Sequence, residues 1–221
     1  GLLRIDWQTQ KSHLFIPNPE DPKSATANGV RSIAADRKGN IWAGTDQGVH
    51  RLDPASGALK HYRHDPKDPF SIGNDITRQI YVDKQGWVWT GSDSGGVGLY
   101  DEPNDRFLRF EFHQGSPGSL SSNTIRRLYE NDNGDLWVGT YPSGVNVYDR
   151  SSAAMRVYRR EAGLDQGLLD NNVEAVEEDK QGNLWLGAGG VTRYNPDKET
   201  FTHYINSTGS DSRVPSGSLL N

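Results

Sequence analysis

The sequence contains no cysteine, so disulfide bonds and metal sites with thiolate ligands are excluded. It also has no run of Lys or Arg, and its formal net charge is -5, which argues against nucleic acid and anionic membrane surfaces as partners. No apolar run approaches the ~18 residues that a membrane-spanning helix requires. We therefore expect no membrane segment within these residues.

Hydrophobic residues are also scarce, at 33% of the chain, whereas Gly (25 residues), Pro (11 residues) and aromatic residues (10%) are plentiful. No segment sustains a helical period. This combination is typical of many short strands joined by tight turns. The composition predicts an all-β protein.

A tryptophan-glycine pattern recurs four times at a spacing of 47 or 48 residues, which predicts a repeat architecture. Its copies are GNIWAGTDQGVHRLD (39–53), GWVWTGSDSGGVGLYD (86–101), GDLWVGTYPSGVNVYD (134–149) and GNLWLGAGGVTRYN (182–195). The tryptophans are Trp42, Trp89, Trp137 and Trp185, and the glycines two positions later are Gly44, Gly91, Gly139 and Gly187.

Each repeat predicts four antiparallel strands. The first strand is apolar and ends at a turn that Asp or Asn opens, with Gly three residues later to supply a positive φ. The second strand carries the Trp, the third follows a Gly, and the fourth ends with an aromatic residue. These units define a half blade at 1–27 and full blades at 28–73, 74–122, 123–171 and 172–221.

A four-stranded sheet of this size cannot bury both of its faces alone, but stacking one sheet on the next can. This predicts a β-propeller with about 4.5 blades, in which the four tryptophans fill the space between blades and the four glycines let the next blade approach. The first residues align with a third strand, and 12–16 supply a fourth. We therefore expect a piece of a larger ring, whose open blade edges would favour homo-oligomers. A compact four-blade form that closes on itself, or pairing between two copies, stays open as an alternative.

The first strand of a propeller blade is the innermost one, so equivalent residues at its start converge on the central channel. These residues lie five positions before the turn Asp or Asn: Arg31, Arg78, Arg126 and Glu174. The arginines could bind a carboxylate or phosphate there. Alternatively, each arginine packs on a neighbouring blade and pairs with an acid there. The loop between the second and third strands adds ligand-contact candidates: Asp46, Asp93 and Tyr141.

No catalytic or cofactor motif is present, and we predict neither enzyme activity nor a cofactor. Of the six histidines, only His61 and His64 are close in sequence, and His61 recurs as His203 in the repeat, which indicates a strand pattern rather than a metal site. The segment 131–135 resembles a calcium loop but lacks its closing Glu. We therefore predict no metal site.

Five features of each unit occur in a fixed order: the Asp-x-x-Gly turn, the Trp-x-Gly strand, the Gly-hydrophobic third strand, the aromatic fourth strand and a linker such as 65–74 or 116–123. In this order they resemble the two-component regulator propeller repeat. The likeness covers essentially the whole chain. The fourth blade departs from it, with Ala188 where Thr or Ser is expected and a shorter loop.

This resemblance implies part of a seven-bladed ring in a periplasmic sensor domain, belonging to a bacterial hybrid histidine kinase or diguanylate cyclase. Its implied partner is a small molecule, such as a carbohydrate or organic anion, or a protein. Two alternatives stay open. The chain could be a protein-interaction scaffold, or a propeller enzyme like the streptogramin lyases, which share the turn-strand feature.

Overall fold

The structure is a computed structural model that describes residues 2–15, 29–152, 154–160 and 167–204. Parts of the expected half blade (16–27) and of the last expected blade (205–221) lie outside the described residues. The chain divides into two compact units, Gly1–Arg109 and Phe110–Asn221. Each unit is described separately below.

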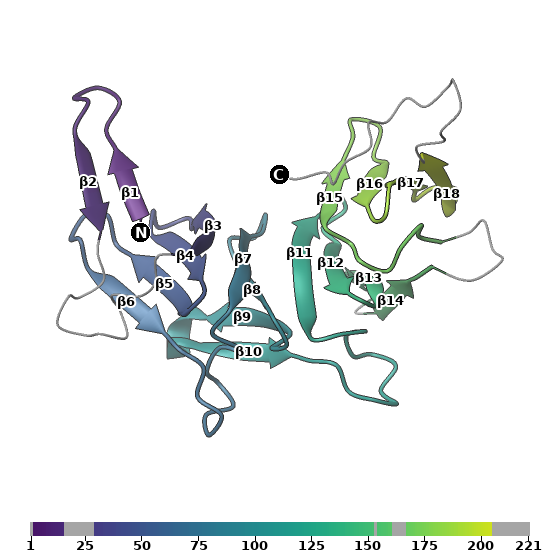
Figure 1. Cartoon of the computed structure of the whole chain (residues 1–221), viewed down its shortest axis with the longest axis horizontal. Coiled ribbons are helices and arrows are strands. Elements are labelled where there is room, and N and C mark those ends of the chain that lie inside the picture. Colours follow the sequence, from purple (N-terminus) through teal and green to yellow (C-terminus); the bar gives the residue numbers. More distant parts are fainter. Residues whose placement is uncertain (1, 16–28, 153, 161–166, 205–221) are drawn as a thin grey trace. The chain divides into compact units, whose positions relative to one another are not determined.

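The fold is all-β, as predicted, and its sheets are consecutive antiparallel meanders (Figure 1). We number the four-stranded sheets as blades 1 to 4 in chain order. The first unit begins with the hairpin β1 (Leu2–Ile5) and β2 (Ser12–Phe15). Blade 1 comprises β3 (Val30–Ala35), β4 (Ile41–Thr45), β5 (Gly48–Leu52) and β6 (Leu59–Tyr62), and blade 2 comprises β7 (Thr77–Val82), β8 (Val88–Ser92), β9 (Val97–Asp101), the 3₁₀ helix η1 (Glu102–Asn104) and β10 (Arg106–Phe110).

The second unit repeats this arrangement. Blade 3 comprises β11 (Thr124–Glu130), β12 (Leu136–Tyr141), β13 (Gly144–Asp149) and β14 (Ala154–Tyr158), and blade 4 comprises β15 (Ala175–Glu178), β16 (Leu184–Gly187), β17 (Val191–Asn195) and β18 (Thr200–Tyr204). Among the described residues no helix is long and apolar enough to cross a bilayer.

The turn between the first and second strands forms as the sequence predicts. In blade 1, the backbone N–H of Gly39 donates to the Asp36 carbonyl, and the Asp36 carboxylate accepts hydrogen bonds from the N–H groups of Lys38 and Asn40. Glycine closes this turn at a positive φ in every blade, which L side chains rarely adopt. The four glycines are Gly39 (83°), Gly86 (90°), Gly134 (88°) and Gly182 (77°).

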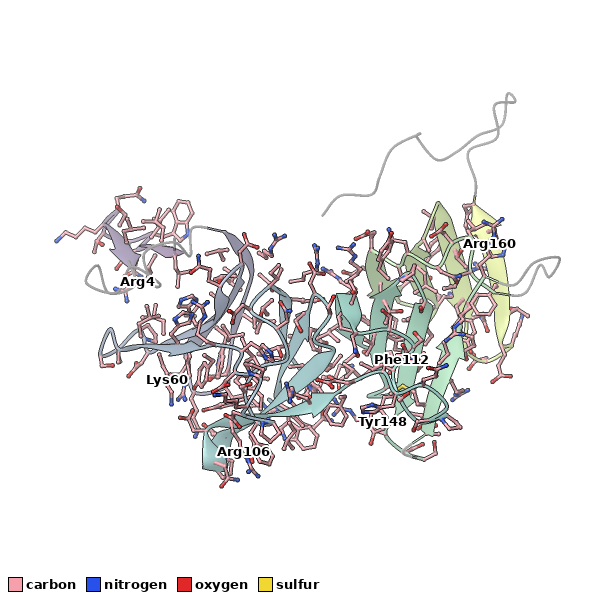
Figure 2. The ribbon with its side chains drawn as sticks, turned by 60° about the horizontal axis from the view of Figure 1, so that its bottom comes forward. Arg4, Lys60, Arg106, Phe112, Tyr148 and Arg160 are labelled. Carbon is pink, nitrogen blue, oxygen red and sulfur yellow. The ribbon has the colours of Figure 1, made fainter. Side chains whose placement is uncertain are left out.

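Blade 1 stacks on blade 2 through Trp42, whose side chain is completely buried. Its ring lies 4.7 Å from the ring of Tyr100 in blade 2, edge to face, and 5.8 Å from Tyr62 in its own blade. Polar contacts border this core: Arg51 donates to the Tyr100 hydroxyl at 3.0 Å, and Lys60, labelled in Figure 2, pairs with Asp105 of blade 2.

Blade 3 stacks on blade 4 in the same way. Trp137 is 2% exposed and shares one core with Val176, Leu184 and Tyr194 of blade 4. Its ring centroid lies 5.6 Å from that of Tyr194. Within each unit, therefore, one tryptophan packs against the blade that follows: Trp42 in the first unit and Trp137 in the second.

The glycine two residues after the tryptophan permits this close approach. A Cβ atom added at Gly44 would lie 3.0 Å from the backbone oxygen of Thr77 in blade 2. One added at Gly139 would lie 2.8 Å from the backbone oxygen of Val173, just before blade 4. Trp89 is also buried, whereas Trp185, on the last sheet, stays partly exposed and stacks on Tyr204 of its own blade at 5.4 Å.

Candidate ligand-binding site

The three candidate arginines occupy one unusual backbone position. In blades 1 to 3 the pairing of the first two strands shifts register at a single residue, and that residue is Arg31, Arg78 or Arg126. A β-bulge of this kind re-aims the side chain of the extra residue. We call these residues the bulge arginines. Each directs its guanidinium toward the residue fifteen positions later, in the loop between the second and third strands.

In blades 1 and 2 that loop residue is an aspartate, and the bulge arginine forms an ion pair with it. Arg31 contacts Asp46 through Nε. Arg78 holds Asp93 with two hydrogen bonds, from Nε at 2.5 Å and from Nη2 at 2.6 Å. In both of these pairs the acid belongs to the arginine's own blade, whereas one interpretation of the sequence places it on a neighbouring blade.

In blade 3 the equivalent residue is Tyr141, which the sequence placed in the loop but the structure places at the end of β12. The contact with the arginine changes its chemistry there. The guanidinium carbon of Arg126 lies 5.0 Å from the centroid of the Tyr141 ring, a cation–π contact. The Nε atom of Arg126 is buried and has no hydrogen-bond partner among the described residues. Tyr141 as a whole residue is 44% exposed.

Blade 4 departs further, because Glu174 replaces the arginine and Gly189 replaces the loop residue. Glu174 is exposed and accepts a hydrogen bond from the Asn172 side chain at 2.8 Å. The loop is also closed differently. A hydroxyl of Thr45 or Thr140 bonds the carbonyl of the next glycine in blades 1 and 3, whereas in blade 4 the N–H of Ala188 bonds the carbonyl of Gly190 at 2.9 Å.

The structure thus joins the sequence-predicted residues in pairs: Arg31 with Asp46, Arg78 with Asp93, and Arg126 with Tyr141. Two of these pairs lie in the first unit and one in the second. Convergence of all of them on one channel mouth stays a prediction. The bulge itself is not visible in the sequence, although the constant fifteen-residue spacing between partners is.

The turn aspartates have a second role that sequence reasoning missed. The indole Nε1 of each of three tryptophans donates to the turn carboxylate of its own blade: Trp42 to Asp36 (2.9 Å), Trp89 to Asp83 (2.8 Å) and Trp185 to Asp179 (2.8 Å). The bond from Trp185 is the main reason that the pKa of Asp179 falls to about 2. At Asp36, burial alone would raise the pKa, but the bonds from Trp42 and Asn40 outweigh it and lower the pKa below its usual value.

Blade 3 lacks this bond because Asn131 occupies the turn position. The Nε1 atom of Trp137 is buried without a hydrogen-bond partner in the described part of the chain. Asn131 instead accepts the backbone N–H of Asp135 at 2.7 Å and faces its carboxylate. Blade 1 has the reverse order, with Asp36 followed by Asn40.

The histidines serve structural contacts. His50 and His61 are cross-strand partners whose rings stack at 4.1 Å, and His61 Nε2 lies 2.7 Å from the Gln47 carbonyl. Burial, followed by the nearby His61 and Arg63, lowers the pKa of His50 to about 4. His203 contacts the Thr192 hydroxyl at 3.1 Å. No group of three or more metal-ligating side chains is found in the described ranges.

The match to a known protein family falls on the repeat. The family model described as "Two component regulator propeller" matches residues 24–47, 119–141 and 167–190. Three segments of the chain therefore match this repeat family. The second matched segment contains both Arg126 and Tyr141, and the third contains the fourth tryptophan.

Solved structures show the propeller fold for this chain. The extracellular domain of BT3049 from B. thetaiotaomicron, described as a hybrid two component system, superposes with a TM-score of 0.71 at 20% identity, covering 81% of this chain and 25% of that one. The chain thus spans about a quarter of its length.

Two other folds are similar at lower scores. PorZ, a surface component of the type-IX secretion system of Porphyromonas gingivalis, has a TM-score of 0.56 at 20% identity, with 78% of this chain and 26% of that one covered. Virginiamycin B lyase from Staphylococcus aureus has a TM-score of 0.58 at 13% identity, with 81% and 56% covered. No curated protein matches the sequence.

Proposed function

We propose that this two component regulator propeller chain is a non-catalytic, ligand-sensing part of a bacterial signalling receptor, located in the periplasm. Its output would be a histidine kinase or a diguanylate cyclase. The observation that carries the proposal is the repeat itself. Three segments match the family described as a two component regulator propeller, and the same fold occurs in the extracellular domain described as part of a hybrid two component system.

The distribution of side chains supports binding rather than catalysis. The stacked faces of the blades are apolar, whereas the loops between second and third strands differ from blade to blade: Asp46, Asp93, Tyr141 and Gly189 stand at one equivalent position. A rigid scaffold with variable loops is a common basis for recognition. A ligand would signal by binding one packing arrangement of the blades and flanking segments more tightly than another.

A thermal-shift screen of the purified chain against oligosaccharides and organic anions tests the proposal. A ligand present at 100 times its Kd stabilises by about 2.7 kcal/mol, which corresponds to a shift of roughly 5–10 °C for a domain of this size. The sensing function predicts at least one such ligand. The absence of any ligand, together with a defined protein partner in a pull-down, would favour the scaffold alternative.

A lyase is the second candidate, because virginiamycin B lyase shares the fold. One structure of that lyase carries a histidine-to-alanine substitution and is described as catalytically inactive. The described histidines of this chain that have a definite contact lie on third or fourth strands or just after them: His50, His61, His64 and His203. Ring opening of a streptogramin B substrate by the purified chain, lost on Arg78→Gln or Glu174→Gln, would establish the lyase and overturn the proposal.

A further inference from the structure

One blade differs from the others at the position where the bulge arginine meets its loop. In blades 1 and 2 the arginine charge is neutralised by an aspartate of the same blade. In blade 3 a tyrosine replaces that aspartate, and no ion pair to Arg126 is found among the described residues. The same β-bulge therefore presents, in blade 3, a guanidinium that no acid among the described residues neutralises.

The environment of Arg126 makes this cation a binding group rather than a solvated surface charge. The side chain is half-buried. Its Nε atom is shielded from water and donates no hydrogen bond to the described residues. No other hydrogen bond or ion pair of the Arg126 side chain is found among the described residues, so the rest of the guanidinium remains able to donate to an incoming acceptor. The Tyr141 ring attracts the guanidinium but offers it no hydrogen-bond acceptor, because the contact is to the ring centroid at 5.0 Å.

Tyr141 supplies an exposed aromatic ring next to the guanidinium. It is the last residue of β12, pairs with Thr124 of β11 and accepts a hydrogen bond from the Ser122 hydroxyl at its backbone oxygen (2.7 Å). The ring is thus fixed to strands rather than carried on a free loop. An aromatic ring and a guanidinium held side by side match a ligand that has one flat apolar face and one oxyanion.

We propose that Arg126 and Tyr141 form a binding site for a small ring compound that bears a carboxylate. The guanidinium takes the carboxylate oxygens, and the Tyr141 ring packs on the ligand's apolar face. Arg31 and Arg78 do not take part, because Asp46 and Asp93 already occupy their guanidinium groups. The proposal rests on the ligand-sensing function above and assigns the chemistry of its ligand.

Calorimetric titration of the full chain tests this site with two carboxylates, glucuronate and cyclohexanecarboxylate, and two neutral analogues, glucose and cyclohexanemethanol. We expect at least one carboxylate to bind at least about tenfold more tightly than its neutral analogue, a difference of about 1.4 kcal/mol. If neither carboxylate shows saturable binding at concentrations up to about 10 mM, the proposal is overturned.

The decisive variant is Tyr141→Asp, which installs the residue of blades 1 and 2. The new aspartate is expected to pair with Arg126 and to weaken carboxylate binding at least about tenfold. Arg126→Gln should weaken it equally and serves as the second variant if the first fails to fold. Arg78→Gln, at the matched position of blade 2, should leave the Kd within about twofold. Equal binding by wild type, Tyr141→Asp and Arg126→Gln would contradict the site.

The same variants separate failure of this site from failure of the proposed function. If the thermal-shift screen finds a ligand that stabilises wild type, Tyr141→Asp and Arg126→Gln equally, the sensing function stands and the Arg126–Tyr141 site is wrong. If the chain binds only a protein partner and no small molecule, the sensing function and the site are both wrong.

Discussion

Blades 1 and 3 occupy the same position in their two units, since each stacks its tryptophan on the blade that follows. Their apolar contacts are nearly interchangeable: Trp42 packs on Tyr100 and Trp137 on Tyr194, each beside a glycine that lets the next blade approach. Their polar groups are not interchangeable. Blade 1 bonds its indole to a turn carboxylate and neutralises its bulge arginine, whereas blade 3 does neither.

The difference shows which part of the repeat holds the fold. Blades 1 and 3 stack through the same apolar contacts although their polar contacts differ. The stacking of blades therefore depends chiefly on buried aromatic area and on the close approach of the backbones. The polar positions can then vary. Where they vary, donors such as Trp137 Nε1 and Arg126 Nε have no partner in the part of the chain that the structure describes. Four predictions test this separation.

The largest effect is expected from removing the interblade tryptophans. Trp42→Ala and Trp137→Ala should each lower the free energy of unfolding by about 3–5 kcal/mol, because each leaves a cavity between two blades. Trp42→Ala should be the more costly of the two, since it also removes a hydrogen bond to Asp36. Urea denaturation monitored by circular dichroism measures both values.

Trp185→Ala is the matched control, because no later described blade covers that side chain. Its cost should stay below about 1.5 kcal/mol, in the range of a partly exposed ring. If Trp185→Ala costs as much as Trp137→Ala, stacking on the following blade is not what makes the tryptophans important.

The second prediction concerns a buried pair that only blade 1 has. His50 is neutral in the folded state, with a pKa of about 4, whereas an unfolded histidine titrates near 6.5. The unfolded state therefore binds the extra proton first, and stability falls as the pH drops from 6.5 to 4. The loss should be at most roughly 3 kcal/mol.

His50→Asn installs the residue that blade 3 has at this position, Asn146, and removes the titration. The slope of unfolding free energy against pH between 6.5 and 4 should flatten in this variant, whatever its stability at pH 7. An unchanged slope would show that His50 does not titrate as its burial beside His61 implies.

The sequence predicts the strands, turns and tryptophan contacts because the repeat reports them four times. The Asp-x-x-Gly turn and the Trp-x-Gly strand each meet a local conformational requirement and a packing requirement. Both requirements are visible in the sequence as residues at fixed spacings. The first-strand prediction for 173–179 held over Ala175–Glu178 despite its weak strand propensity, because the register of the other blades outweighed it.

The candidate site was less predictable, because it depends on side-chain direction rather than on spacing. The sequence shows that arginines recur at the start of the first strand, but the bulge that turns Arg31 and Arg78 toward their own loops follows from strand pairing. The indole bond to the turn aspartate was hidden in the same way. Asp36 and Trp42 are six residues apart, and only the hairpin brings their side chains together.

The third prediction exchanges the turn polarity of blade 3. The double variant Asn131→Asp with Asp135→Asn reproduces the Asp36 and Asn40 pair of blade 1, and so offers the Trp137 indole a carboxylate acceptor. We expect stabilisation by about 1 kcal/mol, the net value of one hydrogen bond to a buried donor. Thermal unfolding of the purified variant measures it.

The single variant Asn131→Asp is the control for this exchange. It supplies the acceptor but sets two carboxylates against each other, because Asp135 already faces position 131. Its gain should be smaller than that of the double variant. If the double variant is no more stable than wild type, the missing indole bond is not what distinguishes blade 3 from blade 1.

The smallest effect is expected from the bulge ion pairs themselves. Arg31 and Asp46 are each about two-fifths exposed, at 39% and 43%, so water and salt screen their attraction. Arg31→Gln should cost no more than about 0.5 kcal/mol, and this cost should shrink further as salt is added. Arg78→Gln should cost somewhat more, because Arg78 and Asp93 are more buried, at 28% and 22%, and share two hydrogen bonds. Unfolding at low and high ionic strength separates the two variants.

A large, salt-independent loss of stability for Arg31→Gln would mean that the bulge arginine helps to hold the blade together. The division between an apolar scaffold and variable polar positions would then fail in blade 1, where it is most complete.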